Sequence, residues 1–331
     1  MKRKEILQRL GYTVPENKKK RVIIHTDIKN EADDHFAVMH HILTPYVEVE
    51  GIIAGHFEYY PELYHAMALK KNIKMDTSFF QVGATMEMSY QEVIKLLELA
   101  EIDDIPVYKG SCVAIKNRNE LPDSEGADFI IKAALSDDPR PIYLALMGNI
   151  TDLAIAYLKE PKIAEKIIAV WIGGADYPTG GKEFNMRQDI EAARIIFESP
   201  MEVWQVPAGT YRTMEISFAE LVKHVRPCGA IGEYLCQQMF DFNDKTAAAS
   251  GAELRDFPHG ETWVIGDNPT LSVLLQSAKL KCWHTEKAPL LNDDLTYAPN
   301  PKGKDIRVYD LIDTRLSISD FYAKMELCYK K

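Results

Sequence analysis

Short apolar runs rich in β-branched residues alternate with longer segments of helical spacing over the first two thirds of the chain. Strand-like runs cover residues 22–25, 47–54, 105–108, 142–146, 167–172 and 203–206. Apolar positions at helical spacing cover residues 33–43, 61–72, 89–101, 127–135, 151–158 and 190–197. Buried strands separated by helices are typical of a parallel sheet with helices on both faces. We therefore predict an α/β fold with a mostly parallel central sheet and Rossmann-like layering.

From residue 215 onward the alternation is less regular. We predict helices over residues 216–224, 229–241 and 268–277, and short strands near 280–286 and 306–310. No internal repeat, low-complexity tract or linker interrupts the 331 residues. Because α/β folds often reach this length as one unit, we predict a single domain over residues 1–331.

Charge narrows the range of partners. The formal net charge is -10, and an acidic protein repels nucleic-acid phosphates and anionic membrane surfaces. A small neutral or cationic ligand, or a metal ion, fits this charge better. The chain begins without an apolar segment of signal-peptide length and has no run long enough for a membrane span, so we expect a cytoplasmic protein. Its five cysteines form no C-x-x-C pair and are expected to be reduced thiols.

Polar and glycine residues follow several of the predicted strands. Ligands of open α/β sheets bind outside the carboxyl ends of the strands, so these positions are the first place to seek a site. The residues concerned are Thr26-Asp27, Gly55-His56, Met147–Asn149 and Gly173–Asp176.

The segment Thr26-Asp27-Ile28-Lys29-Asn30-Glu31-Ala32-Asp33-Asp34 is the densest acidic cluster of this kind. Carboxylates so close together repel one another unless a cation neutralises them, and Ca²⁺ prefers many oxygen ligands in flexible geometry. The helix that begins here also favours negative charge at its N-terminus. The alternative is that Asp33 or Asp34 caps this helix and the rest is a solvated acidic turn. The cluster alone leaves both interpretations open.

Three separated segments resemble the nucleoside hydrolase family (inosine-uridine preferring nucleoside hydrolase-like proteins). The first is HTDIKNEADDHFAVMHHI, whose T-D-x-x-N-E-x-D-D turn is two residues longer than usual and is similar to a divergent branch. The second runs from YLALMGNITDLA to GGKEFNMRQDIEAARIIFES, and the third is GDNPTLSVLL. Together they extend the resemblance over about residues 21–280.

The resemblance implies roles for individual residues. Asp27, Asp34, the Met147 carbonyl and Asp267 would bind Ca²⁺, and Asp27 would also be the base that deprotonates a water held by the metal. Other residues would bind substrate, with ribose hydroxyls held by Asp33, Glu183 and Asn185. Breaking an N-glycosidic bond passes through an oxocarbenium-like sugar, which a carboxylate-rich pocket stabilises. The family also implies a homodimer or homotetramer.

One departure from the family pattern concerns the leaving-group acid. Many members have a histidine immediately before the late aspartate as leaving-group acid, and here Gly266 occupies that position. His56 and His259 are candidates to replace it, and His56 is preferred because it follows a strand end, either as a catalytic residue or as a sugar contact. Aromatic candidates to stack on or hydrogen-bond a base are Tyr59, Tyr60, Tyr211 and Trp263.

Three hypotheses follow. The first is a Ca²⁺-dependent hydrolase that cleaves the N-glycosidic bond of a nucleoside or related ribosyl compound. The second is a hydrolase of another sugar conjugate at the same metal site. The third is a non-catalytic sugar- or nucleoside-binding protein. Gly266 favours the second and third, whereas Asp27 favours the first two because a binding protein needs no base.

Overall fold

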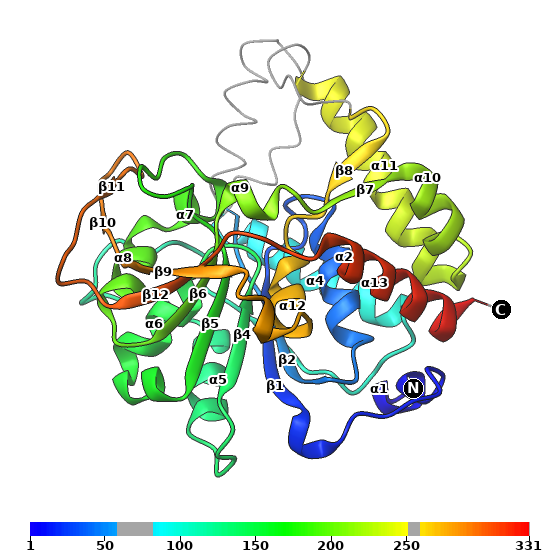
Figure 1. Ribbon diagram of the computed structural model, residues 1–331, viewed down its shortest axis with the longest axis horizontal. Coiled ribbons are helices and arrows are strands. Elements are labelled where there is room, and N and C mark those ends of the chain that lie inside the picture. The colour runs from blue at the N-terminus through cyan, green and yellow to red at the C-terminus, as the bar shows by residue number, and fades with distance from the viewer. Residues whose placement is uncertain (58–81, 251–258, 331) are drawn as a thin grey trace.

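The computed structural model describes residues 1–57, 82–250 and 259–330. Its centre is an eight-stranded sheet in the order β3-β2-β1-β4-β5-β6-β12-β9, in which only the β12–β9 pair is antiparallel (Figure 1). The strands are β1 (Lys20–Thr26), β2 (Val47–Ala54), β3 (Val107–Lys109), β4 (Ile142–Leu146), β5 (Ile167–Ile172), β6 (Glu202–Val206), β9 (Trp283–Lys287) and β12 (Asp305–Tyr309). The predicted α/β fold with a mostly parallel sheet is confirmed.

The strand register brings the polar strand ends together. Strand β1 lies between β2 and β4, with Thr26 paired to Ala54 and His25 paired to Leu146. The residues that follow these three strands therefore meet at one edge of the sheet. Asp27, His56 and Met147 are among them.

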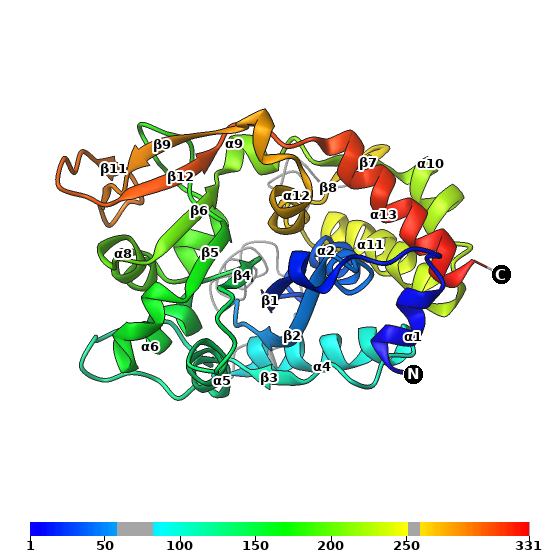
Figure 2. The ribbon, with the colours of Figure 1, turned by 60° about the horizontal axis from the view of Figure 1, so that its bottom comes forward.

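Helices cover both faces of the sheet (Figures 1 and 2). On one face lie α2 (Asp34–Ile42), α4 (Ala84–Leu99), α11 (Gly229–Ser250), α12 (Pro269–Leu275) and α13 (Thr314–Tyr329), and on the other α5 (Glu125–Ala134), α6 (Thr151–Lys159) and α8 (Ile190–Glu198). Successive strand residues point to opposite faces, so Ile24 joins the first core and Ile23 the second. Both side chains are fully buried.

Shorter elements complete the chain. They are α1 (Arg3–Gln8), α7 (Phe184–Gln188), α9 (Ala208–Tyr211), α10 (Phe218–Glu220), the antiparallel pair β7 (Glu215–Ser217) and β8 (Thr262–Val264), and the pair β10 (Leu290–Leu291) and β11 (Tyr297–Ala298). One-turn helical segments cover Glu16–Lys18, Pro161–Glu165, Leu221–Val225 and Ala278–Leu280. No helix in the described part of the chain is both long and apolar enough to cross a membrane.

Several predicted elements need correction. The helix predicted over residues 216–224 begins two residues later than expected. Residues 216 and 217 belong to β7, which pairs with β8, and Ser217 then caps a helical stretch formed by α10 and the one-turn segment Leu221–Val225. This pairing joins segments far apart in sequence, which local periodicity cannot show. Helix α4 begins at Ala84, earlier than expected, and α13 was not predicted. The helix expected over residues 61–72 lies outside the described residues.

Candidate functional site

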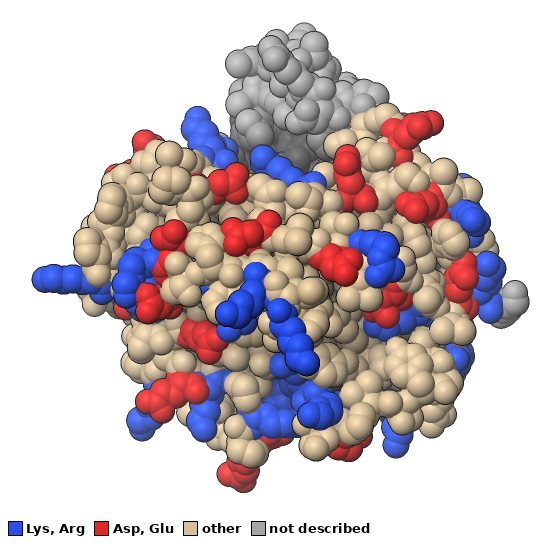
Figure 3. Space-filling model, in the orientation of Figure 1, with Lys and Arg blue, Asp and Glu red and all other residues tan. Residues whose placement is uncertain are grey.

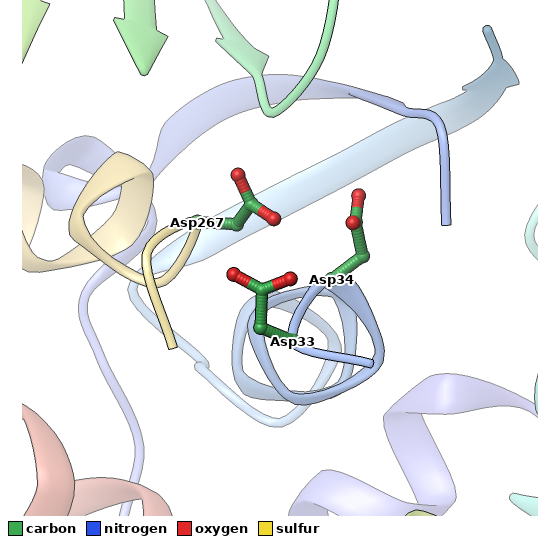
Figure 4. Close-up of side chains that lie close together, drawn as sticks. All are labelled: Asp33, Asp34 and Asp267. Atoms are coloured by element: carbon green, nitrogen blue, oxygen red, sulfur yellow. The ribbon is translucent and has the colours of Figure 1, made fainter. Parts of the chain in front are cut away.

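Three carboxyl groups meet where α2 and α12 begin. Asp33 immediately precedes α2, Asp34 is its first residue, and Asp267 lies two residues before α12. One carboxylate oxygen of each lies within 4.8 Å of those of the other two, and Figure 4 shows the three side chains pointing toward one another. All three residues are buried. Such a set of buried oxygens is the type of ligand group that hard cations prefer.

Asp27 adds a fourth carboxylate from the end of β1. Both of its carboxylate oxygens are buried, and neither finds a hydrogen-bond partner among the described residues. The close approach of the β4 end requires glycine, because a Cβ atom at Gly148 would lie 2.7 Å from the Asp27 Cγ. A buried charge without a partner is costly, so these two free oxygens call for a cation.

Burial and mutual repulsion act on the four carboxyl groups together. Burial raises the pKa of Asp33 to about 6, and burial with the nearby Asp33 charge raises the pKa of Asp34 to about 7. Burial, followed by repulsion from Asp33 and Asp34, also raises the pKa values of Asp27 and Asp267 well above the usual range. The folded chain therefore resists ionising all four groups unless a positive charge joins them. The donor set fits Ca²⁺.

The lengthened turn between Asp27 and Asp33 is held at two points. Lys29 forms an ion pair with Glu92 of α4 at 2.8 Å, and the Trp263 indole N–H donates to Glu31 at 3.0 Å. The amide of Asn30 donates to the Asp27 carbonyl at 2.7 Å, which closes the turn. Trp263, predicted to contact substrate, is only 1% exposed and packs against Phe218, Phe242 and His259. At this edge of the sheet, the contact observed for Trp263 is its hydrogen bond to Glu31 in the turn.

Glu183 and Asn185 lie at the start of α7, beside the ends of β4 and β5. The Glu183 carboxylate accepts hydrogen bonds from the amides of Gly174, Asn185 and Met186, and from the Tyr211 hydroxyl at 3.0 Å. The Asn185 side-chain amide donates to the Met147 carbonyl at 3.1 Å and to the Ile172 carbonyl at 2.8 Å. Asn185 thus fixes the Met147 carbonyl oxygen, which the family resemblance implies as a metal ligand.

His56 is fully buried beyond the end of β2. Its Nε2 lies 3.1 Å from the Thr151 hydroxyl, which donates its own proton to Asp189 at 2.7 Å. His56 Nε2 is therefore the protonated nitrogen, and Nδ1 is a buried acceptor without a partner among the described residues. Burial lowers the pKa of His56 to about 4, so the ring is neutral at pH 7. This arrangement favours accepting a hydrogen bond over donating a proton.

Tyr211 covers the position where the sequence lacks a histidine. A Cβ atom at Gly266 would meet the Tyr211 ring at 3.0 Å and an Asp33 oxygen at 3.5 Å. Burial and the neighbouring Glu183 raise the pKa of Tyr211 well above its ordinary value, which keeps the hydroxyl protonated. Gly266 therefore leaves room for the Tyr211 ring, whose neutral hydroxyl donates to Glu183.

The structure brings most of the predicted site residues to one edge. The carboxyl groups of Asp27, Asp33, Asp34 and Asp267 influence one another, and the metal-compatible trio includes Asp33, to which the sequence assigns a sugar contact. Tyr59 and Tyr60 lie outside the described residues.

Sequence reasoning missed three contacts at this edge. The Thr26 hydroxyl donates to Asp34, Gly148 admits Asp27, and Tyr211 donates to Glu183. In the sequence, only the position of Thr26 next to Asp27 pointed to the contact between Thr26 and Asp34. The other two join residues remote in sequence.

Comparison with known proteins places the chain in a family. A model described as inosine-uridine preferring nucleoside hydrolase matches residues 22–298. The inosine-uridine preferring nucleoside hydrolase of Crithidia fasciculata is 33% identical over 27% of this chain and 29% of its own length. The protein of the same description from Leishmania major is 29% identical over 39% of this chain and 42% of its own length. These alignments thus span less than half of either relative.

Solved structures agree on the fold. The purine-preferring ribonucleoside hydrolase from Gardnerella vaginalis superposes with a TM-score of 0.67 at 17% identity, covering 93% of this chain and 99% of that one. The chain belongs to the inosine-uridine preferring nucleoside hydrolase family. The family predicted from the sequence is therefore confirmed.

Proposed function

We propose that this protein is a Ca²⁺-dependent hydrolase that cleaves the N-glycosidic bond of a nucleoside or a related ribosyl compound. The observation that carries the proposal is the Asp27 carboxylate, which is buried and has two oxygens without a partner among the described residues. Its neighbours Asp33, Asp34 and Asp267 complete an oxygen-rich group. A binding protein would need Asp27 only as a metal ligand and would have no use for it as a base.

The metal would be held by Asp27, Asp34 and Asp267 together with the Met147 carbonyl, which Asn185 orients. When bound, Ca²⁺ would engage the ribose hydroxyls and favour deprotonation of the attacking water. Asp33, Glu183 and Asn185 would receive the remaining sugar hydroxyls. Each of these three residues lies at the carboxyl edge of the sheet or at a helix start beside it.

Asp27 accepts the proton of the attacking water, whose oxygen forms a bond to the anomeric carbon. The N-glycosidic bond breaks, and its electron pair leaves with the nucleobase, which takes its proton from solvent water. The sugar is electron-deficient in the transition state, and the surrounding carboxylates stabilise it. His56 is placed to accept a hydrogen bond from the sugar, since its Nδ1 is unprotonated.

The test is sugar release from a panel of purine and pyrimidine nucleosides and p-nitrophenyl riboside, with Ca²⁺ or with a chelator. We expect Ca²⁺-dependent release of ribose from at least one nucleoside. Cleavage of the nitrophenyl riboside alone would restrict the site to leaving groups that need no acid. Retained ligand binding without turnover of any substrate would replace the hydrolase by a binding protein, and turnover of another sugar conjugate alone would change the substrate class.

A homodimer or homotetramer in the cytoplasm stays a prediction from sequence. Light scattering coupled to size-exclusion chromatography measures the assembly directly. A mass equal to that of one chain would contradict the predicted assembly.

A further inference from the structure

A cavity lies away from the acidic cluster, where the carboxyl end of α12 meets β1, β9 and β12. Its volume is about 460 Å³, within the usual range for small-molecule sites. The lining includes Lys20 at the start of β1, Trp204 in β6, Trp283 in β9 and Arg307 in β12. None of these residues belongs to the proposed hydrolase site.

The lining of this cavity is cationic in an acidic protein. Lys20, Lys281 and Arg307 line it, and no aspartate or glutamate of the described chain does. This contrasts with the formal net charge of -10. Figure 3 shows lysine and arginine side chains gathered in the middle and lower part of this face, over α12 and the start of β1. Neither Lys20 nor Lys281 forms an ion pair within the described ranges, so their charges remain available to an anion.

Aromatic rings hold two of the cations in place. The Arg307 guanidinium lies 3.9 Å from the centre of the Trp204 ring and 4.2 Å from that of Trp283. The nearest oxygen of Glu202 is 3.8 Å from Arg307, longer than a hydrogen bond. Lys20 Nζ lies 4.1 Å from the centre of the Tyr143 ring and donates to its hydroxyl at 2.8 Å. Stacking restrains the guanidinium before any ligand arrives, which lowers the entropic cost of binding.

The same cavity offers aromatic surface to a ligand. Tyr46 and Trp283 line it and are only half-buried, so part of each ring meets solvent. Trp204 and Tyr309 form buried aromatic surface behind them. Flat rings beside fixed cations suit a ligand that has both a planar aromatic group and an anionic group.

We propose that this cavity is a binding site for a nucleoside monophosphate, with the phosphate on Lys20, Lys281 and Arg307 and the base against Tyr46 and Trp283. The site is separate from the proposed hydrolase centre and does not depend on that activity. The cavity is lined by cations, whereas the proposed hydrolase centre is lined by carboxyl groups. An anion therefore binds preferentially in the cavity.

Cys282 provides a local reporter. It lines the cavity and is partly exposed, as is Cys112, which lies elsewhere. The experiment measures alkylation of both thiols by mass spectrometry on the full chain, with AMP, adenosine or inorganic phosphate. We expect AMP to slow alkylation of Cys282 and not of Cys112. Protection should weaken as salt rises, because the contact is between charges near the surface.

A matched pair of variants tests the cationic part. Lys281 has a φ of 44°, a left-handed conformation that asparagine tolerates, so Lys281→Asn removes the charge without straining the chain. We expect it to weaken AMP protection about fivefold. Lys302→Asn removes an exposed lysine from the turn before β12 and should leave protection unchanged. Arg307→Gln should weaken it further, and an unchanged melting temperature would show that the variant is folded.

Four results of the protection assay would overturn the proposal. They are no protection at millimolar AMP, equal protection by phosphate alone, equal protection by adenosine, and loss of AMP protection in Lys302→Asn as large as in Lys281→Asn. A Cys282 that is unreactive before any ligand is added, in a protein that self-associates, would show that a second copy covers this face instead.

Discussion

The four carboxyl groups of Asp27, Asp33, Asp34 and Asp267 are the residues on which the hydrolase proposal depends. Burial raises all four pKa values, and repulsion from neighbouring carboxylates raises those of Asp27, Asp34 and Asp267 further. A raised pKa in the folded state contributes stability that is present at low pH and lost as pH rises through the folded pKa. Without a cation, the free energy of unfolding should therefore fall as pH rises from about 4 through 7.

Metal removal should show this dependence. We expect Ca²⁺ to raise the melting temperature over that of chelator-treated protein more at pH 8 than at pH 5, because only the ionised cluster binds the cation tightly. Thermal denaturation at the two pH values, with Ca²⁺ or EDTA, measures it. An equal or smaller shift at pH 8 would contradict a carboxylate site.

The contact between Gly148 and Asp27 makes a second prediction at this scale. In Gly148→Ala the added methyl would lie 2.7 Å from the Asp27 Cγ and displace the carboxylate. We expect Ca²⁺ affinity to fall at least about tenfold, with a loss of about 1–3 kcal/mol in the free energy of unfolding. Gly260→Ala is the matched control, since a Cβ atom there meets nothing within 4 Å. Isothermal titration of Ca²⁺ that gave the same affinity for both variants would count against the role of Asp27.

At the scale of elements, α4 holds the site turn through one side chain. Glu92 is buried and contacts Lys29 at 2.8 Å, His35 at 2.9 Å, and the Tyr234 hydroxyl. It therefore joins the turn, the first turn of α2 and α11. Burial lowers the pKa of His35, and the hydrogen bond to Glu92 opposes that shift. Replacing either residue therefore leaves the other buried without this partner.

Glu92→Ala should lower the free energy of unfolding by about 3 kcal/mol, because it leaves buried partners unpaired. Glu98→Ala removes an exposed carboxylate from the same helix and should change it by less than about 0.5 kcal/mol. Chemical denaturation of both variants checks the difference. Similar values for the two would show that Glu92 does not anchor the turn.

Elements with one clear apolar pattern were predictable from sequence, and those shaped by distant pairing were not. The spacing around Phe36 and Met39 predicts α2, and the continuous run 167–172 predicts β5. In α13, the buried face includes Ser317 and Lys324, which weaken the apolar stripe. Lys324 is compensated by Asp320 and by the Thr44 hydroxyl, a partner 280 positions away.

At the scale of the whole molecule, the last helix packs against helices α2, α11 and α12. Phe321 of α13 contacts Phe36 of α2 with ring centres 5.9 Å apart, and both are buried in the same core. Helix α2 also carries Asp34, so the end of the chain supports the helix that presents the site. Phe321→Ala should lower the free energy of unfolding by about 3–5 kcal/mol.

Leu327→Ala on the same helix is the control, because its side chain is 53% exposed. It should change the free energy of unfolding by less than about 1 kcal/mol. Urea denaturation of the two variants gives the comparison. A small effect of Phe321→Ala would mean that α13 is not part of the cooperative core.

The site as a whole was only partly predictable from sequence. The polar residues after each strand mark the correct edge of the sheet, because parallel strands end together. The approach of Asp267 to Asp33 and Asp34 joins residues more than 230 positions apart and came only from resemblance to the family. The packing of Trp263 against the turn depends on β8, which has no local signal.

The most direct test is the rate of ribose release from a cleaved nucleoside as Ca²⁺ is titrated, for the natural chain and for Asp27→Asn. The natural chain should show a rate that saturates with Ca²⁺ and vanishes with a chelator. Asp27→Asn should remain folded and lose at least about a hundredfold in rate at every Ca²⁺ concentration, because the base is gone. Full activity in Asp27→Asn, or a rate that does not respond to Ca²⁺, would contradict the proposed site.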